Sequence, residues 1–167
     1  MLRINGNRLS AEGIEFMLPN DFYIDIEGME SVDKNGLRLV PKEKDCFIWM
    51  RTETDEYKTA MESLLDAFSD FVCQTGSEIE LFEDPSKSEY QWIDKPNEYE
   101  KNGLRFASSQ YTALKTDVYR LHFEKVTGYN ERYVIFMQVD RTKTDLKTVL
   151  ARLHVHDFFE SICLAKE

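Results

Sequence analysis

The spacing of apolar residues predicts a series of short strands in the first third of the chain. Two apolar runs on either side of Pro19 predict strands over Ile14–Leu18 and Phe22–Ile26, joined by a turn. Further strands are predicted at residues 37–40 and 45–51. The second of these, "DCFIWMR", is apolar on both of its alternating faces, a pattern typical of an interior strand that is covered on both sides.

The clearest helix is predicted over residues 54–76. Its apolar side chains recur every three or four residues, so they form one stripe along a helix. Thr54 is the expected N-cap, because its hydroxyl oxygen can accept a hydrogen bond from a free backbone amide, and Gly76 is the expected stop. The predicted stripe consists of Tyr57, Met61, Leu64, Leu65, Phe68, Phe71 and Val72.

The second half of the chain predicts mainly strands. Short strands are predicted at residues 77–83 and 90–93 within a loop-rich segment. Three longer strands follow, over Leu104–Ala113, Asp117–Val126 and Glu131–Val139. Helical spacing returns after residue 145, but the apolar faces before and after "LHVHD" point in different directions. A break at that segment therefore predicts two terminal helices.

This order of elements predicts an α+β fold with a mainly antiparallel sheet. Because the central strands are apolar on both faces, we expect helices to cover both sides of the sheet, which gives an α/β/α sandwich. No low-complexity linker interrupts the sequence, and its length suits one core. We therefore expect a single domain over residues 1–167.

The pentamer "KNGLR" occurs twice, at residues 34–38 and 101–105. Asn-Gly is the preferred pair for a type I′ hairpin, because both central residues need positive φ. A hairpin at each copy would pair Val32 with Leu39 and Tyr99 with Phe106. The flanking sequences differ, which favours the same turn chemistry used twice over a duplicated module.

The start of the chain resembles a known superfamily. The segments "GIEFMLPNDFYID" and "FIWMR", followed by the helix "DEYKTAMESLLDAF", are similar to the PsbP-like superfamily, which includes the photosystem II extrinsic protein and a Ran-binding nuclear import factor. The resemblance covers most of the chain and implies an α/β/α fold with non-catalytic, partner-binding roles. The sequence has no match to the acidic "PDNQE"-type segment associated with Ran binding.

The charge of the chain limits its partners. Acidic residues number 31 against 21 Lys plus Arg, giving a formal net charge of -10, and the basic residues form no block. We therefore expect no nucleic-acid binding and no docking on anionic membranes, since both depend on clustered Lys and Arg. A basic protein partner is permitted, and the sequence leaves the oligomeric state open.

The expected location is the cytoplasm. The first ten residues lack the apolar region of a signal peptide, although a chain trimmed of its signal peptide would look the same. No stretch approaches the roughly 18 apolar residues that a membrane-spanning helix needs. Cys46, Cys73 and Cys163 are odd in number and widely spaced, so they predict buried thiols in a reducing compartment.

Motifs for catalysis and for cofactors are scarce. The sequence contains no glycine-rich phosphate loop, nucleophile elbow or calcium loop, so we expect no cofactor and assign no catalytic or metal-binding residue. The strongest alternative is a hydrolase or metal-dependent enzyme that uses His122, His154 and Asp157, because "HVHD" offers two imidazoles and a carboxylate. The favoured interpretation is that His154 ends one helix while His156 or Asp157 caps the next.

The most suggestive binding segment is "EYQWIDKPNEYE". It contains Tyr90, Trp92 and Tyr99 next to acidic residues, and exposed Tyr and Trp in loops are frequent binding anchors. Our leading hypothesis is a non-enzymatic soluble binding or accessory domain that contacts a protein partner, of unknown identity, through these three residues. The opposing interpretation is that Trp92 and Tyr99 pack on the sheet. The sequence leaves enzymatic activity open.

Overall fold

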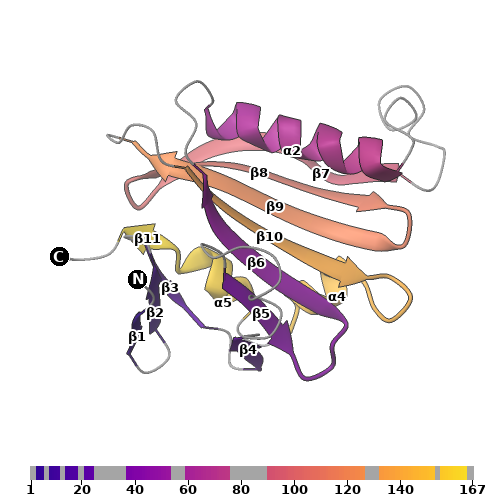
Figure 1. Ribbon diagram of the computed structural model, residues 1–167, viewed down its shortest axis with the longest axis horizontal. Helices are drawn as coiled ribbons and strands as arrows, with labels where there is room; N and C mark the ends of the chain where they lie inside the picture. Colours follow the sequence, from indigo (N-terminus) through magenta and orange to yellow (C-terminus); the bar gives the residue numbers. More distant parts are fainter. Residues whose placement is uncertain are drawn as a thin grey trace.

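The computed structural model describes residues 3–5, 8–11, 14–18, 21–24, 37–53, 59–75, 90–126, 132–152 and 155–164. Two antiparallel sheets make up most of this part of the chain (Figure 1). The small sheet has the order β1-β2-β3-β11, and the large sheet has the order β4-β5-β6-β10-β9-β8-β7. No helix among these residues is both long enough and apolar enough to cross a membrane.

The bounds of the elements are as follows. The small sheet contains β1 (Arg3–Asn5), β2 (Arg8–Ala11), β3 (Ile14–Met17) and β11 (Cys163–Leu164). The large sheet contains β4 (Phe22–Ile24), β5 (Leu37–Pro41), β6 (Cys46–Glu53), β7 (Tyr90–Lys101), β8 (Leu104–Ala113), β9 (Thr116–Lys125) and β10 (Arg132–Asp140). The described helices are α2 (Ala60–Thr75), α4 (Leu146–Leu150) and α5 (Val155–Glu160).

The large sheet is covered differently on its two faces. On one face α2 lies across β7, β8 and β9 (Figure 1), with Leu64 against Ala107 and Phe68 against Tyr111. On the other face a larger core joins the sheet to the small sheet and to α4 and α5. Its buried side chains come from all of these elements and include Ile14, Phe16, Leu39, Ile48, Phe106, Phe123, Tyr133, Ile135, Leu146, Val149, Phe158 and Ile162.

The predicted α/β/α sandwich is wrong, because the described chain is mainly β and helices do not form a layer on both faces. α2 has 16 residues, but α4 and α5 have five and six. They share the cover of their face with the small sheet, whose Phe16 meets Phe158 edge to face at 5.3 Å between ring centroids. An apolar pattern on both faces of a strand requires cover but does not specify whether a helix or a sheet provides it.

Most predicted strands are present. β3, β4, β5, β6, β8, β9 and β10 lie within a few residues of their predicted bounds, and the strand predicted at residues 77–83 lies outside the described residues. The sequence did not predict β1, β2 or β11. The strand predicted at residues 90–93 is also present, but it does not end there: the rest of the segment to Tyr99, predicted as loop-rich, continues it as one edge strand, β7, with two register shifts against β8.

The helix starts differ from their predictions. α2 begins at Ala60, and Glu62 N donates to Thr59 Oγ1 at 3.2 Å, so the predicted N-cap at Thr54 is wrong. Thr59 and Glu62 have the spacing of a capping box, and their side chains also bond at 3.3 Å. α5 begins at Val155, so His156 and Asp157 lie within the helix and the prediction that either caps it is also wrong.

The second "KNGLR" hairpin is confirmed. Asn102 and Gly103 have φ values of 55° and 78°, and Tyr99 pairs with Phe106 as predicted. The turn of the first copy lies outside the described residues. Leu39 is flanked by Ile24 on β4 and by Ile48 on β6, so both of its neighbouring positions are taken and the predicted pairing with Val32 is wrong.

Candidate functional site

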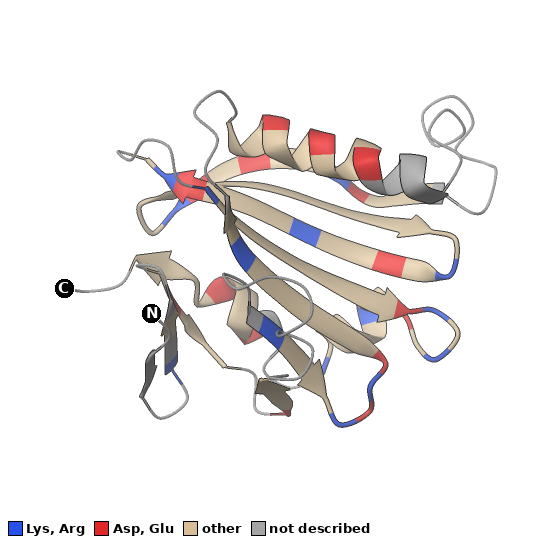
Figure 2. Ribbon diagram, in the orientation of Figure 1, with Lys and Arg blue, Asp and Glu red and all other residues tan. Residues whose placement is uncertain are grey.

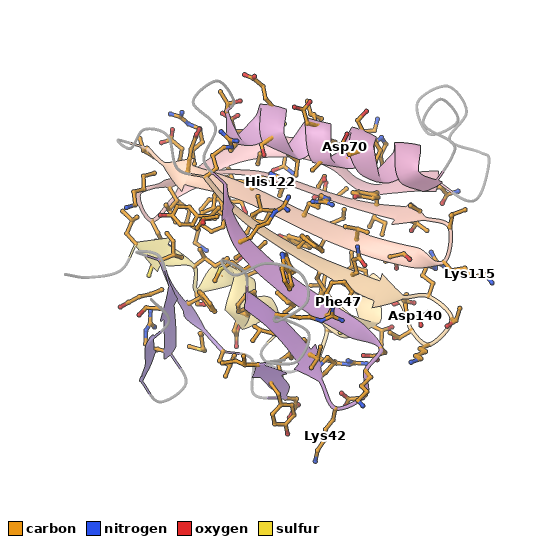
Figure 3. The ribbon with its side chains drawn as sticks, in the orientation of Figure 1. Lys42, Phe47, Asp70, Lys115, His122 and Asp140 are labelled. Carbon is orange, nitrogen blue, oxygen red and sulfur yellow. The ribbon has the colours of Figure 1, made fainter. Side chains whose placement is uncertain are left out.

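Three connecting segments meet at one end of the large sheet. They are the β5–β6 turn (residues 42–45), the β8–β9 turn (114–115) and the β10–α4 loop (141–145). Asp140 N donates to Asp45 O, and Arg141 N donates to Lys115 O, both at 2.8 Å. These backbone bonds hold the three segments together, and Figure 3 shows Lys115 and Asp140 at this end, away from His122 under α2.

A groove with a cavity volume of about 610 Å³ lies at this end of the sheet. Its residues come from β5, the β5–β6 turn, β6, the start of β9 and the end of β10. They combine apolar, amide, hydroxyl and charged side chains. The lining consists of Arg38, Val40, Lys44, Asp45, Cys46, Phe47, Thr116, Gln138, Val139 and Asp140.

An arginine and aromatic row crosses the sheet beside the groove. Strand register aligns Arg120 of β9, Phe136 of β10, Trp49 of β6 and Arg38 of β5. The Arg120 guanidinium lies 4.9 Å from the centroid of the Phe136 ring, and that of Arg38 lies 4.2 Å from the centroid of Phe47. These cation–π contacts hold two long side chains against aromatic rings, and one of the two pairs, Arg38 and Phe47, belongs to the lining of the groove.

The buried carboxylates near the groove are engaged inside the protein. Arg152 Nη1 donates to Asp45 Oδ1 at 3.0 Å, and Arg152 Nη2 bonds the other carboxylate oxygen. The hydrogen bonds from Arg152 lower the pKa of Asp45. Asp117 accepts from Thr112 Oγ1 at 2.6 Å and from Leu146 N at 2.8 Å.

A polar contact of a different kind lies under α2. Ser63 Oγ and His122 Nδ1 share a hydrogen bond of 2.9 Å, and His122 is 0% exposed. Burial, and then the neighbouring arginines, lower the pKa of His122 to about 2, so its ring is neutral at ordinary pH. The pair joins α2 to β9 and is closed to solvent, which makes it a structural contact.

The structure does not bring Trp92 and Tyr99 together. The Trp92 ring lies 4.5 Å from that of Phe68 and packs with Tyr111 under α2. Tyr99 is 39% exposed and stacks on Phe106, which belongs to the core on the opposite face. Tyr90 is the first residue of β7, and its side chain lies outside the described part. The three residues therefore do not form one continuous aromatic surface.

His122 and Asp157 also lie on opposite sides of the large sheet. His122 faces α2, whereas Asp157 is in α5, whose Phe159 stacks on Tyr119 in the larger core at 4.5 Å. His154 lies outside the described residues. In the part of the chain that the structure describes, no group of three or more His, Cys, Asp or Glu side chains could hold a metal ion.

Sequence reasoning missed the groove because its residues come from distant segments. Arg38, Phe47 and Gln138 become neighbours only when β5, β6 and β10 pair. The available signal was weak: Arg38 interrupts a short strand that is otherwise apolar. An arginine within such a strand indicates a polar or ligand-facing position, but it does not indicate which segments share that position.

No protein-family model matches the chain, and no curated protein matches it. The resemblance to the PsbP-like superfamily therefore stays a prediction.

Proposed function

We propose that this protein is a non-enzymatic binding domain that receives a segment of a partner protein in the groove between the β5–β6 turn and strands β9 and β10. The observation that carries the proposal is the groove itself. Its volume of about 610 Å³ lies in the range of ligand sites. Val40 and Phe47 offer apolar contacts, while Thr116 and Gln138 offer hydrogen bonds to a peptide backbone.

The chemistry of the lining supports binding over catalysis. The described residues that line the groove include no histidine and no serine. Burial raises the pKa of the Cys46 thiol to about 12, so it is protonated and a poor nucleophile at neutral pH. Ser63 and His122, which share a hydrogen bond, are buried under α2 and are not part of the groove. No observation favours the metal-dependent alternative.

The edge strand β7 offers less to a partner than its sequence indicated. Trp92 is committed to packing under α2, and Lys101 pairs with Glu160 of α5. Pro96 and the register shifts disrupt the regular edge that a partner strand would extend.

Cys46 and Cys163 are free thiols, which supports a reducing compartment, the cytoplasm, for the interaction.

A displayed library of random peptides, selected on the wild-type protein, tests the proposal. Selected peptides are then titrated against Phe47→Ala, which truncates a ring in the groove, and against Tyr99→Ala, which truncates a ring on β7. We expect Phe47→Ala to weaken binding about tenfold or more, as the loss of an aromatic anchor does, and Tyr99→Ala to change it less than about twofold.

Thermal unfolding of both variants verifies that each remains folded. If no peptide is enriched, the proposed function is wrong. If Tyr99→Ala abolishes binding while Phe47→Ala preserves it, the partner binds β7 and the groove is not the site.

A further inference from the structure

Exposed cations gather around the groove in a chain that is strongly acidic overall. Lys42 and Lys44 project from the β5–β6 turn, Lys115 from the β8–β9 turn, and Lys143 from the β10–α4 loop, and all four are exposed. Arg141 of the same loop is also exposed, but its guanidinium pairs with Asp117 at 3.4 Å. Figure 2 shows blue segments at these turns, with red segments between them. Lys143 Nζ also donates to Lys44 O at 3.2 Å, so two of the segments are joined through a lysine.

Most of the acidic side chains at this end form hydrogen bonds or ion pairs within the protein. Asp45 bonds Arg152, and Asp117 bonds the backbone N–H of Leu146. Asp140 accepts from Thr142 N at 2.9 Å, and Asp145 caps α4 by accepting from Thr148 N at 2.8 Å. These bonds leave the negative charges of Asp140 and Asp145 in place. In the three segments the four exposed lysines still outnumber Glu43, Asp140 and Asp145, so this end is less acidic than the chain as a whole, whose formal net charge is -10.

We propose that the groove binds an acidic peptide segment of the partner. Its carboxylates pair with Lys44, Lys115 and Lys143, and an apolar or aromatic side chain of the segment packs on Phe47. This inference rests on the proposed function and names the chemistry of its ligand. Lys42, Lys44, Lys115 and Lys143 form a basic rim beside the groove. The pairing follows from charge complementarity between this basic rim and an anionic chain, which also speeds association.

A peptide fits this surface better than a nucleic acid does. Phosphate-backbone binding needs an extended basic track, but the basic rim is short and is interrupted by Glu43. The exposed face of α2 is acidic: Glu62, Asp66 and Asp70 are spaced four residues apart along it and are exposed (Figure 2). Such a surface repels a long polyanion but tolerates a short acidic segment held at the groove.

Fluorescence polarisation with labelled synthetic peptides tests the inference. The peptides share a central Phe and are flanked by Glu, by Gln or by Lys, and a short single-stranded DNA is the fourth probe. We expect the Glu peptide to bind about tenfold tighter than the Gln peptide at about 50 mM salt, and this advantage to shrink at about 300 mM because of screening.

Charge reversal locates the interaction. The double variant Lys44→Glu/Lys115→Glu should lose the preference for the Glu peptide. Lys95→Glu/Lys125→Glu makes the same change in net charge on β7 and at the far end of β9, and should preserve the preference within about threefold. Both pairs of lysines lie near the surface, and thermal unfolding verifies the fold of each variant.

The outcomes separate this inference from the proposed function. If the Gln and Glu peptides bind equally and Phe47→Ala weakens both, the groove binds peptides but the acidic preference is wrong. If the control reversal weakens binding as much as the groove reversal, or if the DNA binds as tightly as the Glu peptide, the inference is also overturned. If no peptide binds, the proposed function falls with it.

Discussion

Acidification should destabilise this protein through His122 well before its carboxylates titrate. His122 is fully buried against α2, and burial lowers the pKa of its ring from 6.5 to about 2. The unfolded chain therefore binds a proton near pH 6.5 that the folded chain rejects. The stability associated with neutral His122 is fully present above pH 6.5 and is lost as the pH falls toward the folded pKa.

The size of this loss in stability depends on how far the pH lies below 6.5, the pKa of histidine in the unfolded chain. Each unit corresponds to about 1.4 kcal/mol, so the free energy of unfolding should be about 2 to 3 kcal/mol lower at about pH 4.5 than at about pH 7.5. The pKa values of Asp45 and Asp145 are lowered, so the stability that these carboxylates contribute is lost only below their ordinary value of 3.8. Between pH 4.5 and 6.5 the change in the free energy of unfolding therefore comes mainly from histidine.

Urea titrations followed by tryptophan fluorescence measure this effect between about pH 7.5 and about pH 4.5. In His122→Asn the side-chain amide can keep a hydrogen bond to Ser63 but cannot titrate, so the variant should lose most of the pH slope. Ser63→Ala is the matched control. It removes the hydrogen bond between residues 63 and 122 but keeps the imidazole of His122, so it should keep the pH slope of the wild type. The other histidines are common to all three proteins. If His122→Asn retains the wild-type slope, His122 is not held neutral by burial and the reasoning fails.

Three further predictions concern single side chains. Arg152→Ala leaves the carboxylate of Asp45, which is 6% exposed, without its partner and should lower the free energy of unfolding by about 1 to 3 kcal/mol. Cys46 should resist iodoacetamide in the native protein at about pH 8, because burial raises the pKa of its thiol, while the half-buried Cys163 is modified faster as judged by mass spectrometry. Gly103→Ala adds a Cβ at a φ of 78° and 3.2 Å from a side chain of β11, and should cost about 1 to 2 kcal/mol in urea unfolding.

Each of these predictions has a result that contradicts it. For the ion pair, Arg8→Ala breaks a more exposed contact with Glu15, so an equal loss of stability in both variants would show that burial of Asp45 does not matter. Equal alkylation rates for the two cysteines would place the Cys46 thiol in contact with solvent. A Gly103→Ala protein as stable as the wild type would mean that the turn has relaxed to a different conformation.

Local signals made part of this fold predictable. The alternation of apolar and polar residues located β8 almost to the residue, because side chains on a strand point to opposite faces in turn. The Asn102-Gly103 turn fixed its own register, since a two-residue hairpin leaves one way to pair Tyr99 with Phe106. The same logic failed at the first pentamer, because β5 pairs with β4 and β6 and thereby takes both flanks of Leu39.

The aromatic segment shows how an element assignment decides a functional prediction. Trp92 and Tyr99 are seven residues apart, an odd number, so a strand directs their side chains to opposite faces. Interpreted as a short strand that gives way to a loop, the segment predicted one aromatic surface; as the continuous strand β7, it separates the two rings. The two register shifts in β7 do not change this result: Trp92 pairs with Tyr111 on one face of the sheet, and Tyr99 pairs with Phe106 on the other.

The groove depends on contacts that the sequence does not encode locally. β6 pairs with β10 across some 80 residues of chain, and this pairing brings Phe47 beside Gln138. On the same face, α2 is held over β7, β8 and β9 by Phe68 packing on Tyr111 and by the bond between Ser63 and His122. One half of the face is thus closed by a helix, while the groove lies in the other half, where Arg38 lines it. A buried neutral histidine and an open groove are therefore two consequences of how far one helix covers this face of the sheet.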